Sequence, residues 1–443
     1  MFAVNRFTYK SEFKMISYFW FRRDLRIEDN HGLAAALHNS DKVIPVFIFD
    51  TTILDKLPDK DSRVSFIHKK LLKVDKTIKD KGGSGLQVYH GCPDIIWREL
   101  LNKNKGDIYS NRDYEPSAID RDLRIEEICR EQNLNFYSYK DQVIFEENDI
   151  LKADGKPYTI YTPYRKAWEK EFNNELLQTY DSSSPNNYNK EPCKPIPSLS
   201  DLGFKKSSVI EGKTSLDKSI LENYHITRDF PAMDATSRLS VQLRFGTISV
   251  RQLIKQSINS NQTYVHELIW REFFMMILYH FPESADQEFK KKYSSVPWRH
   301  DKDDFKAWCL GQTGYPMVDA GMRELNATGY MHNRVRMITA SFLVKHLMID
   351  WRSGEQYFAR KLMYYDMSAN VGNWQWAAGC GCDAAPYFRV FNPKTQQEKF
   401  DPEYKYIKKW IPEFDTLKYP QEIVEHKFAR ERAISTYKKA LQG

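Results

Sequence analysis

The sequence predicts an α/β amino-terminal domain with a parallel sheet, followed by a larger all-helical domain. Strand-like and helix-like patterns alternate through the first third of the 443 residues, and no strand alternation is found beyond about residue 206. Alternating strands and helices are typical of a parallel sheet covered by helices. A polar, proline-rich stretch at 181–202 lies between the two patterns. We therefore expect an α/β domain at 15–145, a connector at 146–205 and a helical domain at 206–443.

The α/β domain is predicted from short apolar runs that read as buried strands. These runs are Ile16–Phe21, Val43–Phe49, Leu86–Tyr89 and Ile108–Ser110. Helical periodicity of the apolar residues places helices near 30–39, 62–80 and 117–132. Such a domain is Rossmann-like, yet Arg-Arg-Asp-Leu-Arg follows Phe21, where dinucleotide-binding sheets carry G-x-G-x-x-G. The missing fingerprint disfavours a nicotinamide-dependent enzyme.

The carboxyl-terminal half is helical in its periodicity. Its clearest helical segments are Tyr264–Phe281, Val318–Leu325, Asn333–Ile349 and Gly354–Met363. Six of the ten tryptophans fall within about a quarter of the chain, at Trp270, Trp298, Trp308, Trp351, Trp374 and Trp376. Such a cluster suits stacking on flat rings, and an ordinary aromatic core is the alternative.

Composition narrows the class of protein. The hydrophobic fraction is 41% and the charged fraction 28%, as in ordinary globular proteins. No apolar run reaches the roughly 18 residues of a membrane-spanning helix, and residues 1–14 lack the apolar core of a signal peptide. We expect a monomer in the cytoplasm, associated with the nucleoid in a bacterium. The net charge of +7 permits a polyanionic partner.

The six cysteines give no metal-binding pattern. Only Cys380 and Cys382 are close in sequence, and their C-x-C spacing is too tight for a usual zinc knuckle. No pair of histidines or cysteines at ligand spacing accompanies them. We expect reduced thiols and no metal site.

Three segments combine charged or polar side chains with aromatic ones. Glu267 and Trp270 are three residues apart and share a helix face, although a solvated acid beside a core indole would look the same. Arg334 and Arg336 point to different faces, so one meets solvent or phosphate and the other turns inward, unless both are surface arginines. In Asp366–Trp376 two indoles flank a glutamine after a polar turn, where a surface turn entering a core helix is the alternative.

A fourth segment, Thr236–Ser240, places hydroxyls at a predicted helix start. Hydroxyls and free backbone N–H groups at such a start form a phosphate cradle. A simple N-cap would produce the same pattern, and the segment alone does not separate the two.

These motifs together resemble the photolyase/cryptochrome flavoprotein family, and most closely the class I cyclobutane pyrimidine dimer (CPD) photolyases. The resemblance covers nearly the whole chain, from Trp20–Arg26 to Ile423–Lys427. The motifs that carry it are Thr236–Ser240, Glu267–Phe273, Gly314–Pro316, Val318–Ala320, Met331–Leu343 and Asn373–Pro393. The resemblance implies an α/β antenna domain and a helical domain that binds FAD and DNA.

The resemblance also assigns expected cofactor contacts. The matching positions are Tyr224, Thr236, Ser237, Arg238, Leu239, Ser240, Tyr264, Arg336, Tyr364, Asp366 and Asn370. Asn370 matches the residue that faces the reactive flavin nitrogen. Relatives pair the arginine at Arg336 with an aspartate, whereas this chain has Tyr364 at that position. A neutral hydroxyl is a weaker acceptor, so Arg336 either turns to another anion or leaves extra positive charge near the flavin.

The activity implied by the resemblance is that of a deoxyribodipyrimidine photolyase, a carbon–carbon lyase that repairs UV-damaged DNA under blue light. Excited reduced FAD donates an electron to a dimer that has been flipped out of the duplex. The catalytic positions match Glu267, Asn333, Met337 and Asn370. The DNA and substrate contacts match Trp270, Trp376, Arg228, Arg334 and Arg389. The electron-transfer relay matches Trp374, Trp351 and Trp298.

Two other functions and one cofactor question stay open in the sequence. A cryptochrome-type photoreceptor would bind flavin without repair, but the intact substrate set favours the enzyme, because such polar groups cost stability without a ligand. A dark flavin oxidoreductase would need a nicotinamide-binding signature, which this sequence lacks.

The family can also bind a second, antenna chromophore of folate or deazaflavin type. Its identity is open here, because the acidic residue of folate-binding relatives is missing near Pro116–Ala118.

Overall fold

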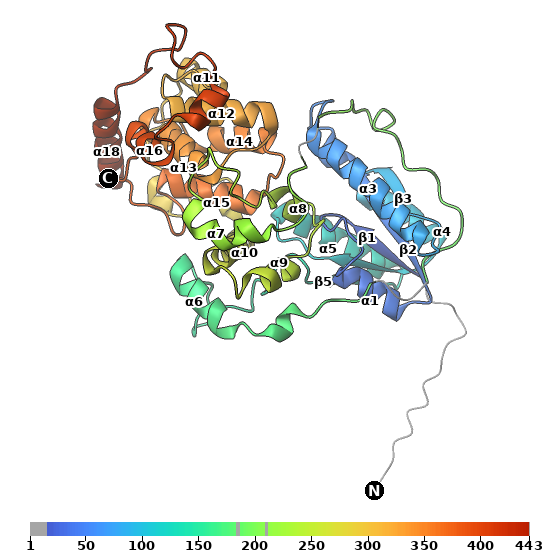
Figure 1. The fold of residues 1–443 in the computed structure, drawn as a ribbon. Helices are drawn as coiled ribbons and strands as arrows, with labels where there is room; N and C mark the ends of the chain where they lie inside the picture. Colours follow the sequence, from blue (N-terminus) through green and yellow to red (C-terminus); the bar gives the residue numbers. More distant parts are fainter. Residues whose placement is uncertain (1–15, 183–186, 209–210, 443) are drawn as a thin grey trace.

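The computed structural model describes residues 16–182, 187–208 and 211–442. Figure 1 shows the α/β region and the helical region side by side, which confirms the predicted fold class. The sheet has five parallel strands in the order β3-β2-β1-β4-β5. They are β1 (Ile16–Phe21), β2 (Lys42–Asp50), β3 (Gln87–Gly91), β4 (Asp107–Asn111) and β5 (Phe136–Tyr139). This order is doubly wound, with its switch point between β1 and β4.

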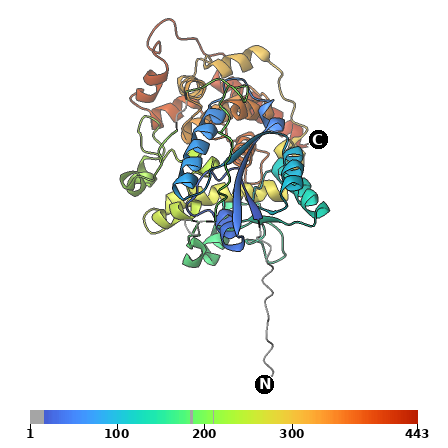
Figure 2. The same cartoon turned by 90° about the vertical axis from the view of Figure 1, so that its right-hand side faces the viewer.

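Helices cover both faces of this sheet, as Figure 2 shows. They are α1 (His31–Asn39), α2 (Thr51–Leu54), α3 (Ser62–Asp80), α4 (Pro93–Lys103) and α5 (Pro116–Glu131). Successive side chains of a strand point to opposite faces. Accordingly, Phe19 and Phe21 of β1 belong to the core shared with α1 and α3, whereas Tyr18 and Trp20 belong to the core shared with α4 and α5. The four predicted strands are confirmed, while β5 and α4 were not predicted.

The segment between the two regions is structured in two parts. Helix α6 (Tyr161–Glu171) packs its Tyr164 and Trp168 into the core of the helical region, together with Phe273. The later part returns to the sheet, where the backbone N–H of Val43 donates to Asn187 and the N–H of Asn189 donates to Val43. The first part of the expected connector therefore contributes to the helical core.

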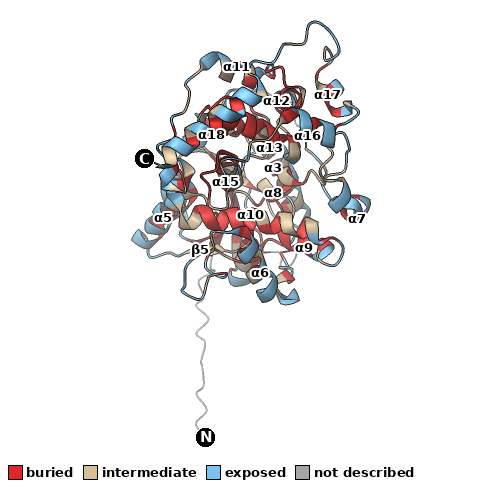
Figure 3. Cartoon of the chain, turned by 90° about the vertical axis from the view of Figure 1, so that its left-hand side faces the viewer, coloured by how far each residue is buried: buried red, intermediate tan, exposed pale blue. Residues whose placement is uncertain are grey.

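The helical region begins at α7 (Lys218–Thr227) and ends at α18 (His426–Gln442). Between them lie α8 (Ser240–Arg244), α9 (Val250–Ser257), α10 (Gln262–His280), α11 (Lys302–Leu310), α12 (Pro316–Thr328), α13 (Asn333–Ser341), α14 (Trp351–Lys361), α15 (Met367–Ala378), α16 (Pro393–Phe400) and α17 (Lys405–Trp410). Figure 3 shows α10 as a largely buried helix that crosses the region. None of the helices in the described ranges is both long and apolar enough to span a membrane.

The predicted helices of this region are confirmed, with one correction. The helix expected over Asn333–Ile349 ends as α13 at Ser341 and continues as a π-helical turn over Phe342–His346. Such a π-turn inserts an extra residue into the helical repeat. Phe342, Leu343 and Val344 are all buried and apolar, so the sequence pattern continues without a break across the change from α-helix to π-helix.

Candidate functional site

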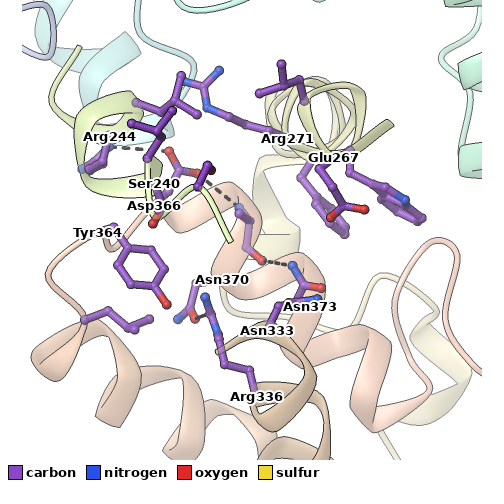
Figure 4. A pocket seen from close by; sticks show the side chains of 18 of the residues that line it. Ser240, Arg244, Glu267, Arg271, Asn333, Arg336, Tyr364, Asp366, Asn370 and Asn373 are labelled. Carbon is purple, nitrogen blue, oxygen red and sulfur yellow. Dashed lines mark hydrogen bonds and ion pairs between the residues drawn. The ribbon is translucent and has the colours of Figure 1, made fainter. Parts of the chain in front are cut away.

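A cavity of about 460 Å³ opens among α7, α8, α10, α13 and α15. It is lined by fifteen of the residues expected at the site, namely Tyr224, Arg228, Ser237, Leu239, Ser240, Tyr264, Glu267, Trp270, Asn333, Arg336, Met337, Tyr364, Asp366, Asn370 and Trp376. Figure 4 shows Glu267 and Arg271 entering from α10, opposite Arg336 and Asn370. The expected cofactor set and the expected substrate set therefore share one cavity.

Glu267 lies in the cavity wall with a cationic partner. Arg228, at the carboxyl end of α7, donates from Nη1 to Glu267 Oε1 and also lies over the Tyr224 ring, 5.3 Å from its centroid. Both side chains are partly buried, at 21% and 33% exposure. The alternative of a freely solvated acid is thereby excluded, since the carboxylate is held by an arginine inside the wall. Its free lone pairs remain available to a hydrogen-bond donor in the cavity.

Asn370 links a cation on one side to a buried acid on the other. Arg336 Nη2 donates to Asn370 Oδ1 at 3.0 Å, and Asn370 Nδ2 donates to Glu355 Oε1 at 3.0 Å. Tyr365 donates its hydroxyl to the same carboxylate at 3.2 Å. Burial raises the pKa of Glu355, and the two donors oppose that rise. Sequence reasoning missed Glu355, because its role depends on contact with Asn370 from another helix.

Tyr364 does not replace the missing carboxylate beside Arg336. Its hydroxyl donates to the backbone oxygen of Met331 at 3.0 Å. The Arg336 guanidinium lies 5.6 Å from the centroids of the Tyr364 and Phe358 rings. No carboxylate within the described part of the chain forms an ion pair with Arg336. Tyr364 is thus a neutral neighbour of Arg336, and among the described residues the guanidinium bonds the Asn370 amide in place of a carboxylate.

Asp366 lines the cavity and also ties the two domains together. It accepts a hydrogen bond from the backbone N–H of Ala369 and so caps α15. The carboxylate pairs with Arg23 of the α/β domain at 2.6 Å and lies 3.8 Å from Arg244. Burial alone would raise its pKa, but the charges of Arg23 and Arg244 hold the pKa of Asp366 well below its usual range. Asp366 is therefore an anion in the cavity wall.

The Thr236–Ser240 segment presents hydroxyls to the cavity. Ser237 and Ser240 line it, and Tyr264 donates its hydroxyl to Ser237 Oγ at 3.2 Å. No side chain caps α8, so the alternative of a simple N-cap is not what the structure shows. Thr236 and Arg238 do not line the cavity. Arg238 instead pairs with Asp234 at 3.2 Å.

Two of the arginines expected to contact DNA lie outside the cavity. Arg334 pairs with Asp229 at 2.8 Å and lies over the Phe400 ring. Arg389 is exposed in the segment after α15, with its guanidinium 5.5 Å from the Phe391 ring centroid. The opposite facing of Arg334 and Arg336 is confirmed, because only Arg336 lines the cavity.

The tryptophans of the expected relay occupy one core cluster. Trp374 and Trp351 are buried in it, and Trp298 packs at its edge. Gly354 makes room for Trp374, because a Cβ there would lie 2.2 Å from the indole. The ring contacts of Trp374 lead to Phe358 at 5.0 Å and to Trp308 at 6.1 Å, and Trp308 in turn contacts Tyr357 at 5.8 Å. Trp308 was not among the residues expected to take part.

The cavity also contains residues that sequence reasoning did not select. They are Leu243, Arg244, Leu268, Arg271, Phe274, Tyr330, Met331, Leu362, Ala369 and Asn373. Arg271 directly follows the expected Trp270, and burial lowers the pKa of Arg271.

All six cysteines are unpaired, and the described residues hold no group of three metal-ligating side chains.

The donors and rings of the cavity suit a flavin nucleotide. Ser237, Ser240 and Arg244 offer hydroxyl and guanidinium donors of the kind that bind a pyrophosphate. Asn370 and the unpaired Arg336 offer polar contacts to the edge of a flat ring system, and Leu268 and Phe274 offer apolar surface. The residues present therefore fit FAD.

Comparisons with known proteins agree with this geometry. The chain matches the family model described as DNA photolyase over residues 17–184 and the one described as FAD binding domain of DNA photolyase over 264–418. It is 34% identical to the deoxyribodipyrimidine photo-lyase of Alkalihalophilus pseudofirmus, over 95% of this chain and 97% of the relative.

Two solved structures are similar over nearly the whole chain. A class III photolyase of Agrobacterium tumefaciens is 32% identical, with a TM-score of 0.86 and coverage of 98% of this chain and 99% of that one. A photolyase of Sulfolobus tokodaii, described with two FAD molecules, is 36% identical, with a TM-score of 0.82 and coverage of 96% and 100%. From the shared cavity, the family models and these relatives, the chain belongs to the photolyase/cryptochrome family and carries its FAD-binding domain.

Proposed function

We propose that this protein repairs cyclobutane pyrimidine dimers in DNA under blue light. The observation that carries the proposal is the single cavity that holds Glu267, Trp270, Asn333, Met337 and Trp376 together with the flavin-fitting residues. A dimer bound against the first set would lie next to a flavin bound against the second. The family's DNA photolyase model and the photo-lyase relatives support the same activity.

The cofactor side of the proposal assigns roles to residues of this chain. Ser237, Ser240 and Arg244 would hold the pyrophosphate, and Asn370 with Arg336 would contact the flavin ring. When bound and reduced, FAD supplies after light absorption the single electron that splits the cyclobutane ring. Asn370 is kept in one orientation by Arg336 on its oxygen and Glu355 on its nitrogen, so it presents a fixed amide to the ring.

The substrate side rests on one acid and two indoles. Glu267 forms an ion pair with Arg228, and its free lone pairs would accept a hydrogen bond from a pyrimidine imide N–H. Trp270 and Trp376 offer flat apolar surfaces that exclude water from the dimer. Arg334 and Arg389 stand outside the cavity and would contact backbone phosphates, which supplies affinity without reading sequence.

The second chromophore and the class of photolyase stay proposals. Asn111 at the carboxyl end of β4 and the following Asp113 and Glu115 are occupied by contacts within the protein, because Asn111 binds Asp24 and the two acids bind Arg23. This leaves folate, deazaflavin or a second flavin to be identified by extraction of the holoprotein. The class I assignment rests on the motif resemblance along the chain and is part of the proposal, and a class III enzyme is among the similar structures.

The test is light-dependent repair of UV-irradiated oligothymidine by the photoreduced holoprotein. Base absorbance should return under blue light and stay constant in the dark. Glu267→Ala should slow repair about tenfold or more, because one charge-assisted hydrogen bond contributes roughly 1.5–3 kcal/mol. The matched control is Glu222→Ala, an exposed acid on α7, which should repair normally. Reducible bound flavin without any repair would instead favour a cryptochrome-type photoreceptor.

A further inference from the structure

One face of the Trp270 indole is covered by a tyrosine from a distant part of the chain. Tyr161, the first residue of α6, stacks on Trp270 with ring centroids 3.6 Å apart and an interplanar angle of 9°. Tyr161 is only 7% exposed, and Trp270, not Tyr161, lines the cavity. The indole also contacts Phe273 edge-on at 5.6 Å and Phe274 at 5.3 Å, and the part of it that these rings and Tyr161 leave uncovered lines the cavity.

Tyr161 itself is held from several directions. Its hydroxyl donates to the backbone oxygen of His266 at 2.8 Å, one turn before Trp270 on α10. Its ring packs edge-on against Phe273. Its backbone N–H donates to Asp383 Oδ2 at 3.1 Å, and Asp383 lies in the segment that follows α15. The residue thus contacts α10, which carries Trp270, and the segment that directly follows α15, the helix that carries Trp376.

Helix α6 is anchored separately at its other end. Trp168 donates from Nε1 to Glu272 Oε1 at 2.7 Å, and both side chains are buried. Phe172, just after α6, stacks on Trp168 with centroids 4.9 Å apart and an interplanar angle of 9°. Loss of the Tyr161 ring therefore leaves the helix attached to α10.

We propose that Tyr161 is a positioning residue that holds the Trp270 indole in the orientation that receives a flipped-out pyrimidine dimer. The inference rests on the proposed repair function. An indole supported on one face loses little freedom when a base stacks on the other, which lowers the entropic cost of binding. A stacked aromatic pair contributes enough to account for about a twofold to tenfold difference in affinity.

The experiment compares Tyr161→Leu, Tyr161→Phe and the matched control Phe172→Leu, each as FAD-loaded protein. Equilibrium binding is measured to a duplex with one cyclobutane thymine dimer and to the same duplex without damage. Tyr161→Leu should bind the damaged duplex about twofold to tenfold more weakly and the undamaged one as before. Tyr161→Phe should bind the damaged duplex as tightly as the parent protein does, because the phenyl ring keeps the stack on Trp270. Phe172→Leu removes an equally flat stack away from Trp270 and should bind damage normally.

A second readout does not depend on DNA. Fluorotryptophan labelling gives a fluorine resonance for Trp270, assigned by its absence in Trp270→Phe. We expect this resonance to shift or broaden in Tyr161→Leu and to stay as in the parent protein in the other two variants. An unchanged resonance in Tyr161→Leu, or equal effects in Phe172→Leu, would overturn the inference. If the parent protein shows no preference for damaged DNA, the proposed function fails, and the resonance still decides whether Tyr161 positions Trp270.

Discussion

Arg23 offers the sharpest test of how the two domains hold the cavity together. Its guanidinium contacts Asp113 at 3.0 Å, Glu115 at 2.9 Å and Asp366 at 2.6 Å, and all four side chains are at most 14% exposed. Arg244 contacts Glu115 at 2.9 Å, and the charge of Arg271 also acts on Asp366. Arg23→Met would keep the side-chain volume but remove the cation that all three buried carboxylates contact.

The size of the effect follows from this burial. Removing one partner of a buried ion pair costs roughly 3–5 kcal/mol, because the other charge stays desolvated. Urea denaturation followed by tryptophan fluorescence should show a loss of this size in Arg23→Met. Asp366→Asn keeps an N-cap for α15 and removes only the charge. In a double-mutant cycle the two changes should couple by about 0.5–3 kcal/mol.

The same cluster predicts a dependence of stability on pH. Arg23 and Arg244 hold the pKa of Asp366 below that of an unfolded aspartate, against the effect of burial. A depressed pKa stabilises the folded state above about pH 4 and loses that stabilisation as the pH falls through the folded value. The urea midpoint of Asp366→Asn should therefore change less on acidification than that of the parent protein.

A small effect would refute this reasoning. A loss below about 1 kcal/mol in Arg23→Met is what an exposed pair would give. Strict additivity with Asp366→Asn would show that the two charges do not act together. The matched control is Lys405→Met, whose partner Glu403 is 69% exposed and for which no measurable loss is expected.

Two further predictions concern the flavin environment. Tyr364→Asp places a carboxylate beside Arg336, which has no carboxylate partner among the described residues. The midpoint potential of the bound flavin should fall, because added negative charge disfavours an anionic reduced form. Spectroelectrochemical titration measures this potential, and an unchanged value would contradict the prediction. Trp308→Phe removes a ring that contacts Trp374, so photoreduction of oxidised flavin should slow while repair by previously reduced protein stays unchanged. Equal photoreduction rates would exclude Trp308 from the path.

Much of the fold was predictable from local patterns. The runs around Tyr18–Phe21 and Val43–Phe49 are continuous apolar strands, as expected for strands buried on both faces. Helix α10 was visible in its length and periodicity. Strand β5 was missed because its four residues, Phe136–Tyr139, are only half buried at the sheet edge and alternate weakly. Helix α4 was also missed, although it begins with Pro93 and buries Trp97 and Leu101 one helical turn apart.

The site was predictable where a motif is contiguous. Glu267 and Trp270 share a face of α10, and Arg336 and Asn370 were both expected in the cavity that they line. By contrast, sequence reasoning placed Arg238 among the cofactor contacts, and the structure pairs it with Asp234 outside the lining. A positive φ of 50° at Arg238 turns the backbone there, and nothing in the local pattern indicates this.

The sequence by itself determined the fold class, the principal helices and most of the residue types that line the cavity, because helical and strand periodicity are properties of neighbouring residues. Only the tertiary structure decided which distant groups meet. The stack of Tyr161 on Trp270, the pairing of Arg23 with Asp366 and the bond of Asn370 to Glu355 join separate elements. Such contacts depend on how helices and sheet pack, and a packed pair leaves no periodic signal along the chain.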